Sequence, residues 1–166
     1  MNHPPSVALS RVVVAFSVGL VLGACRAAGD LPSGVAHDAV AHALIDSLVV
    51  DEARAADRYQ RIVNRFGGVA PFAELTVAPL PRLDALLDVV ARRGWVAPDP
   101  FAGPIGLEVY ADVAGACDVA ARFTRLMVSR YDRLLTRTLA PDIRAVTEGN
   151  RAAAIGADLA RTTACH

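Results

Sequence analysis

A four-helix bundle of two antiparallel hairpins is the all-α fold class that the sequence predicts. The first observation behind this prediction is a long run of apolar residues at helical spacing, over about 36–66. The second is that Gly and Pro residues divide the following chain into further segments of helical length. The third is that the β-branched alternation typical of strands does not occur beyond the N-terminal apolar run.

The first helix is expected over 36–66 and to end at Gly67-Gly68. Its stripe alternates steps of four and three residues, the heptad spacing of packed helices. The stripe consists of Ala41, Ile45, Leu48, Glu52, Ala55, Tyr59, Ile62 and Phe66. Because an unpaired buried carboxylate is costly, Glu52 needs a partner or water.

The second helical region, 71–93, contains Pro79 and Pro81. Proline lacks the backbone donor and clashes with the preceding turn, so we expect a kink or a break, with a short helix over 71–78 and another from Leu80. A crossing loop rich in Pro and Gly is expected over 95–104.

The third helix is expected over about 106–138, and the fourth from Pro141 to about Thr163. The stripe expected for the third consists of Val109, Val113, Ala116, Ala120, Phe123, Met127, Tyr131, Leu134 and Leu135. The stripe expected for the fourth consists of small residues and valine: Val146, Gly149, Ala153, Gly156 or Ala157, and Ala160. Small residues allow the backbone of a neighbouring helix to approach closely.

The N-terminus has the features of an export signal. Arg11 precedes the apolar run Val12–Leu22, which is too short to span a membrane and ends in Leu22-Gly23-Ala24-Cys25. This ending resembles the lipobox of bacterial lipoproteins, which implies cleavage after residue 24 and acylation of Cys25. We therefore expect a signal peptide over 1–24, a tether over 25–35 and a helical domain over 36–166, facing the periplasm or the exterior and attached to the membrane by lipid. An ordinary secretory signal is the alternative.

With Cys25 lipidated, Cys117 and Cys165 remain as an even pair in an oxidising compartment. If the chain turns back at Ala140-Pro141, both lie at the same end of a helical hairpin, where a disulfide is sterically possible. Two free thiols are the alternative. The chain has 17 basic and 17 acidic residues and a formal charge of +0, without a run of one sign, so no nucleic-acid partner is expected.

The segment Val50–Tyr59, VDEARAADRY, resembles the helix motif of a ferritin-like bacterial family, domain of unknown function twenty-two-zero-two. The layout of about residues 40–160 is also similar, with Phe72 opening the second helical region and Asp142-Ile143 early in the last helix. The resemblance implies a ferritin-like bundle with metal ligands in its interior.

This chain lacks those ligands. Di-iron bundles use a Glu from each of two helices and a Glu-x-x-His from each of the other two, whereas this chain has no Glu-x-x-His. The resemblance implies that Pro79 and Arg82 stand at the ligand positions of the second helix and Ala157 at that of the last. Ser129-Arg130 replaces the acidic pair of the third helix, with Asp132 kept. The histidines His37 and His42 are spaced five apart, off one helical face, and are expected to be solvated.

Arg82 is the candidate partner of Glu52, because it falls on the inward face of the facing helix. In this hypothesis the arginine replaces the charge of the lost metal and leaves a vestigial ion pair. The alternative is that the proline kink turns Arg82 to solvent, so that Glu52 meets water.

Two functions follow from these patterns. The first is a non-catalytic, lipid-anchored binding module for a protein partner or a small ligand, without a cofactor, because nucleophile elbows and phosphate loops do not occur. The second is a metal-binding ferritin-like protein with iron-handling or oxidoreductase activity. Its ligands would be Glu52, Asp57, Asp132 and Glu148.

Overall fold

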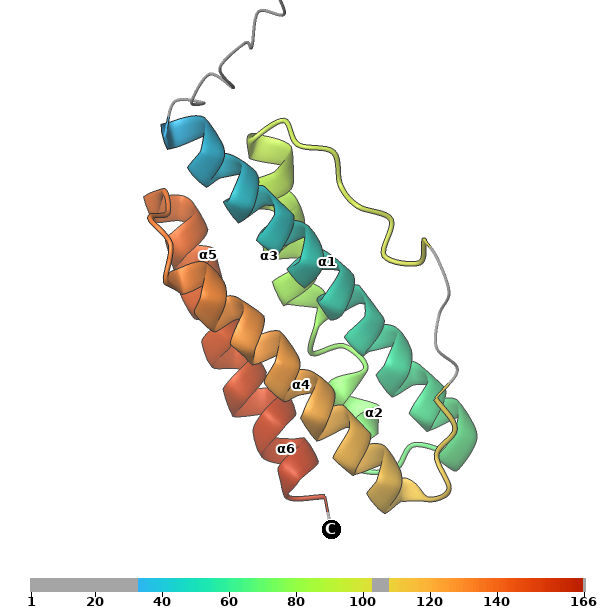
Figure 1. Cartoon of the computed structure of the whole chain (residues 1–166). Helices are drawn as coiled ribbons and strands as arrows, with labels where there is room; N and C mark the ends of the chain where they lie inside the picture. Colours follow the sequence, from blue (N-terminus) through green and yellow to red (C-terminus); the bar gives the residue numbers. More distant parts are fainter. Residues whose placement is uncertain (1–32, 103–107, 166) are drawn as a thin grey trace, which may run out of the picture. The chain divides into compact units, whose positions relative to one another are not determined.

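Helices are the regular elements of the part of the chain that the structure describes, residues 33–102 and 108–165 of a computed structural model. The α-helices are α1 (Ser33–Phe66), α2 (Phe72–Leu75), α3 (Leu80–Arg92), α4 (Val113–Leu135), α5 (Pro141–Ala153) and α6 (Ala160–Thr163). A π-helix, η1 (Ala154–Leu159), joins α5 to α6 without a break. These six helices and η1 form four rods, because α2 and α3 follow one another along one rod and α5, η1 and α6 along another (Figure 1).

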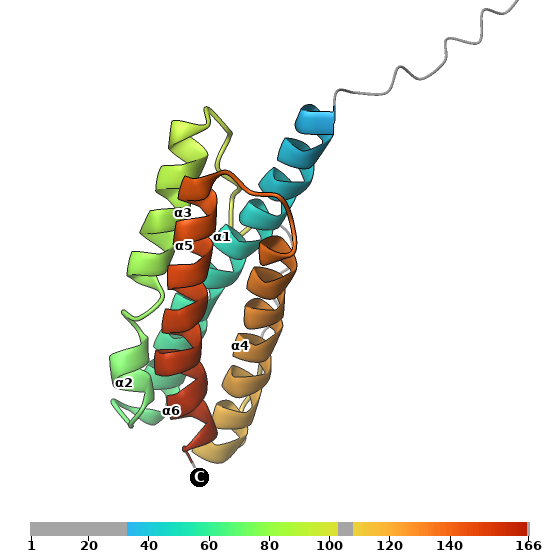
Figure 2. The same ribbon diagram turned by 90° about the vertical axis from the view of Figure 1, so that its left-hand side faces the viewer.

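The four rods pack as a bundle. α1 contacts α3 and α4, while α5 and η1 contact α4, and α5 also contacts α3. Figure 2 shows α3 and α5 side by side, α1 passing behind α5, and α4 on the side of α5 away from α3. α3 runs antiparallel to α1, α5 runs antiparallel to α4, and the described parts of the 93–112 connection return along the outside of α1 (Figure 1). The prediction of an all-helical bundle of four helices is therefore confirmed.

Two hydrophobic clusters form the interior. One packs around Ile45, Leu86 and Tyr131, and the other around Tyr59, Phe72 and Cys117. Along the sequence of each rod, a buried polar residue falls between the two clusters: Glu52, Arg82, Thr124 and Asp158. The core is thus divided by a polar layer near its middle.

The expected stripe of the first helix is confirmed, since every member from Ala41 to Ile62 is buried and only Phe66 is half-buried. The break in the second helical region is also confirmed. Pro79 and Pro81 occupy the start of α3, where a missing amide proton costs little. The tether was predicted three residues too long, because α1 already begins at Ser33.

The predicted start of the third helix, near residue 106, is wrong. α4 begins at Val113, and Asp112 caps it by accepting a hydrogen bond from the Gly115 amide at 2.8 Å. Val109 is therefore not part of the buried stripe and is 83% exposed. Residues 108–110 belong to no regular element, so the connection between α3 and α4 is longer than predicted.

The predicted stripe of the fourth helix is also wrong. The buried residues of this rod are Ile143, Thr147, Asn150, Ala154, Asp158 and Thr162, whereas Gly149, Ala153, Gly156 and Ala160 are exposed. The prediction assumed a regular α-helix and placed small residues inward. The structure turns a more polar face to the interior.

Candidate functional site

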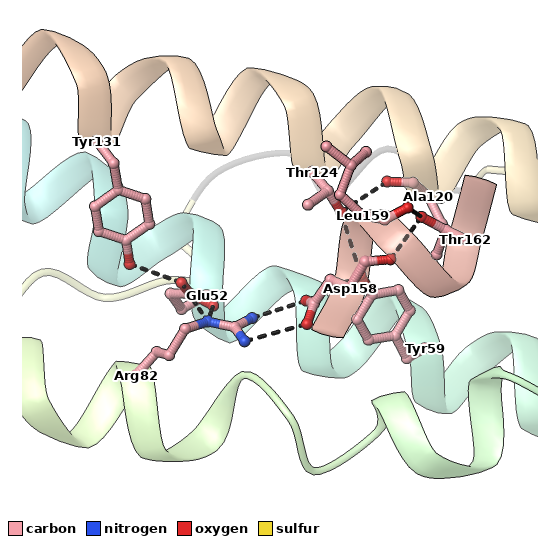
Figure 3. Close-up of polar contacts among 9 residues, drawn as sticks. All are labelled: Glu52, Tyr59, Arg82, Ala120, Thr124, Tyr131, Asp158, Leu159 and Thr162. Carbon is pink, nitrogen blue, oxygen red and sulfur yellow. Dashed lines mark hydrogen bonds and ion pairs between the residues drawn. The ribbon is translucent and has the colours of Figure 1, made fainter. Parts of the chain in front are cut away.

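The site lies in the polar layer and centres on Arg82, which joins two carboxylates from different rods (Figure 3). Arg82 Nε donates to Glu52 Oε1 at 2.9 Å and to Oε2 at 3.0 Å. On its other edge, Nη1 donates to Asp158 Oδ1 at 3.1 Å and Nη2 to Oδ2 at 2.7 Å. The guanidinium therefore bridges α1 and η1 from its position in the first turn of α3.

Neutral side chains complete the hydrogen bonding around the two carboxylates. Tyr131 of α4 donates its hydroxyl to Glu52 Oε1 at 2.7 Å, and Tyr59 of α1 donates to Asp158 Oδ2 at 3.2 Å. The Tyr59 hydroxyl also lies 3.4 Å from Thr124 Oγ1. All four rods thus contribute to one connected network, which is the arrangement that makes a buried polar group tolerable.

Burial governs the protonation of this centre. Glu52 is 0% exposed, and burial raises its pKa, an effect that the Arg82 hydrogen bond and charge only partly offset. Burial acts to lower the pKa of Arg82, but the hydrogen bonds and charges of Glu52 and Asp158 outweigh it and raise that pKa. Arg82 therefore keeps its positive charge, and its hydrogen bonds to Glu52 counteract the cost of burying that carboxylate.

The arrangement of donors defines what the centre can do chemically. Nε and both Nη atoms of Arg82 are engaged, and both carboxylates accept from Arg82 and from a tyrosine. A carboxylate held in this way is a poor general base, because an arginine and a tyrosine already donate to it. The role that these hydrogen bonds support is to fix the positions of the rods relative to one another.

The sequence patterns do not predict Asp158 as a site residue, because they put Ala157 at the inward position. The π-helix inserts one extra residue, so the inward series runs Ala154, Asp158, Thr162 instead of following the α-helical period. A signal was present in the sequence: Thr147 and Asn150 continue the same polar face. Asn150 Nδ2 donates to the Arg82 carbonyl at 2.9 Å, so this face contacts the site directly.

The structure does not bring together the alternative metal ligands. Asp57 pairs with Arg61, Asp132 with Arg151, and Glu148 with Arg144, each at the surface and away from Glu52. Among the residues that the structure describes, no three His, Cys, Asp or Glu side chains form a group able to hold a metal ion.

The histidine prediction was wrong for His42. Its ring stacks on Trp95 with centroids 4.2 Å apart and lies 3.4 Å from Asp46, so it joins α1 to the connection after α3. Cys25 and the side chain of His37 lie outside the described residues.

Cys117 and Cys165 form a disulfide, with their Cα atoms 6.0 Å apart. Cys117 lies near the start of α4 and Cys165 follows α6, so the bond joins the open end of the α4–α5 hairpin. This is the pairing that the turn at Ala140-Pro141 suggested. It closes the end of the bundle farthest from that turn.

Comparison with known proteins adds no relative to this description. The sequence matches no protein-family model, and neither a curated protein sequence nor a solved structure matches the chain.

Proposed function

We propose that the mature chain is a non-catalytic binding module, lipid-anchored through Cys25, in the cell envelope. Its scaffold is a ferritin-like bundle in which Arg82 takes the place of the metal. The observation that supports this proposal is the Arg82 guanidinium bonded to Glu52 of α1 and Asp158 of η1 in the bundle interior. Ferritin-like proteins hold metal ions in the bundle interior with carboxylates that different helices contribute. Here a cation attached to α3 supplies the positive charge.

The topology and the sequence motif support the ferritin-like part of the proposal. Ferritin-like bundles have one long crossover between their two hairpins, and the described parts of the connection from α3 to α4 run along the outside of α1. Glu52 belongs to the segment VDEARAADRY, on which the family resemblance rests. Its partner Arg82 stands where the family places a ligand.

Metal analysis tests the replacement of the metal. Protein expressed in medium supplemented with iron and manganese should contain metal well below one ion per chain. The Arg82→His variant should gain divalent metal, because it puts an imidazole between two carboxylates that are already in place. Arg82→His/Asp158→Asn is the matched control and should lose that gain. Stoichiometric metal in the natural protein would contradict the proposal, as would a folded Arg82→His variant that takes up none.

The anchor has its own test. In the described residues, none of the helices has the length and apolar character that crossing a membrane requires. Mass analysis of the mature N-terminus should find a diacylglycerol thioether on Cys25, and Cys25→Ser should move the protein out of the membrane fraction. A mature chain that begins elsewhere, without lipid, would overturn the anchor and leave the proposal for the bundle standing.

A further inference from the structure

Four arginines line a cleft of about 210 Å³ between α1 and α4, beside the connection that follows α3. They are Arg54, Arg58 and Arg61 of α1 and Arg130 of α4. The other lining residues are Asp51, Glu108 and Phe123. Among the described residues, three of these arginines form ion pairs, with Glu108, Asp57 and Asp51, which leaves an excess of one positive charge in the cleft.

Arg58 is the most buried of these arginines, at 9% exposed. Its Nε and Nη2 donate to the two Glu108 carboxylate oxygens at 2.6 and 3.0 Å, and its guanidinium lies 3.8 Å from the centre of the Phe123 ring. Nη1 is buried and has no hydrogen-bond partner among the described residues. A buried donor without an acceptor is costly, so this arginine has capacity for a further oxygen.

Arg54 also has hydrogen-bond donors beyond the one that it uses. Its Nε donates to the Pro100 carbonyl at 2.9 Å, and within the described ranges no carboxylate forms an ion pair with it. Arg61 and Arg130 pair with Asp57 and Asp51 at the edge of the cleft. The unpaired positive charge is therefore that of Arg54, one helical turn from Arg58 on α1.

An apolar groove continues from the cleft. It has a volume of about 430 Å³, shares Glu108 and Phe123 with the cleft, and is also lined by Val119, Arg122 and Leu126. Leu126 is 62% exposed, which is high for a large apolar side chain on a packed helix. A ligand held by the arginines would therefore have an apolar surface beside it.

We infer that this cleft binds a phosphate monoester with an apolar substituent. The phosphate would accept from Arg54 and Arg58, and the substituent would lie along Phe123 and Leu126. A phosphate group carries close to two negative charges near neutral pH, which Arg54 and Arg58 would balance once Glu108 leaves Arg58, and its oxygens suit the forked donors of arginine. Glu108 occupies the fork of Arg58 in the free protein, as an internal carboxylate that the ligand displaces. The inference rests on the proposed function and names the ligand class of the binding module.

Titration calorimetry of the purified protein at constant ionic strength tests this inference. Hexyl phosphate should bind saturably with one site per chain, about tenfold more tightly than inorganic phosphate, because the alkyl group buries apolar surface. Hexanol should not bind measurably. Absence of saturable binding by both phosphates would overturn the inference, and equal affinities would overturn its apolar part.

Matched variants tie the binding to these residues. Arg54→Gln should weaken hexyl phosphate about tenfold or more, whereas Arg133→Gln, an exposed arginine on α4, should leave affinity unchanged. Glu108→Gln should tighten binding several-fold by freeing Arg58, whereas Glu148→Gln makes the same change in net charge away from the cleft and should have no effect. If Arg54→Gln behaves like Arg133→Gln, the inference is wrong.

Vesicles distinguish the two sources of such a ligand. The Cys25→Ser protein, whose own acyl chains cannot insert, should bind phosphatidic acid vesicles but not phosphatidylcholine vesicles if the ligand is a lipid headgroup, and Arg54→Gln should abolish that binding. Binding of hexyl phosphate without vesicle binding would assign a soluble ester. Protein that is acylated and metal-free but binds neither phosphate would contradict this inference alone and leave the proposed function intact.

Discussion

Arg82 reaches two carboxylates at once because a guanidinium has donors on two edges of one plane. One edge faces Glu52 and the other faces Asp158. A lysine ammonium, a point donor on a flexible stem, has no such pair of edges. The identity of this residue therefore determines whether α1, α3 and η1 can be joined through a single side chain.

Removing this cation should destabilise the fold strongly. Arg82→Met leaves Glu52 and Asp158 facing each other without a positive charge, which should cost about 3–5 kcal/mol in the free energy of unfolding. Urea unfolding at neutral pH measures the loss. Arg144→Met is the matched control, because Arg144 pairs with Glu148 at the surface, and it should cost less than about 1 kcal/mol.

A triple variant, Glu52→Gln/Arg82→Met/Asp158→Asn, separates the cost of the broken pairs from the cost of packing. With all three charges removed, most of the stability lost in Arg82→Met should return. An unchanged or raised melting temperature for Arg82→Met itself would show that the ion pairs do not contribute to the fold as argued.

Glu108 makes the stability contributed by the connection after α3 depend on pH. Partial burial acts to raise its pKa, but hydrogen bonds from Arg58 and Tyr110 outweigh burial and lower the pKa below the ordinary value of 4.5. The stabilisation is therefore present above about pH 4.5 and is lost as the pH falls through the lowered pKa.

The expected result is that Glu108→Gln lowers stability at pH 7 by no more than about 1 kcal/mol, since the side chain is partly exposed and screened. The difference from the natural protein should shrink as the pH falls below 4.5 and vanish once Glu108 is protonated in both states. Urea midpoints at several pH values measure this. A difference that stays constant down to pH 3 would rule out the ionised Glu108 as its source.

Among the elements, η1 has the largest influence on the site. In an α-helix each residue advances about 100°, so the inward series after Ala154 would continue with Ala157 and Arg161. The extra residue of the π-helix moves the inward positions to Asp158 and Thr162. Without it, an alanine would face Arg82 and an arginine would face the second hydrophobic cluster.

This interpretation predicts the outcome of two single-residue deletions. Deleting Gly156, an exposed residue of η1, should convert the π-helix to an α-helix and keep Asp158 and Cys165 near their present places, with little loss of stability. Deleting Ala145, an exposed residue of α5, should turn part of the rod by about 100° relative to its neighbours and destabilise the protein severely. Thermal unfolding compares the two, and equal losses would contradict the argument.

For the whole molecule, the polar layer divides the core into two hydrophobic clusters, and each cluster contains residues from several rods. Sliding a rod along its axis would leave Glu52 or Asp158 against apolar side chains, at a high desolvation cost. The layer therefore favours one axial register of the rods, the best-attested role of buried polar groups in helical assemblies.

The disulfide constrains the molecule at the opposite end from the Ala140-Pro141 turn. It links residues with a sequence separation of 48, so by chain entropy it should contribute about 4 kcal/mol. Reduction should lower the urea midpoint and also raise the m-value, because the reduced unfolded chain is more expanded. Cys117→Ala/Cys165→Ala should match the reduced protein, and identical midpoints before and after reduction would show that the bond does not constrain the unfolded state.

Local patterns in the sequence were sufficient for the helices, the proline break and the stripe of α1, because helical periodicity and chain punctuation act over a few residues. The same reasoning suggested Arg82 as the partner of Glu52, since each residue could be assigned to an inward face. The prediction for the start of α4 is wrong, because Glu108 lies outside the helix and accepts hydrogen bonds from Arg58 on α1 and from Tyr110.

Asp158 and the arginine cleft emerged from packing between rods. The rotation of the last rod depends on η1, and a one-residue π insertion is stabilised by what the helix faces, which no short sequence window contains. Sequence alone would assign Arg54, Arg58 and Arg130 to the solvated surface, because their spacing gives no indication of a shared cleft. They meet only where α4 lies against α1 and the connection crosses both, so their joint chemistry is a property of the assembled bundle.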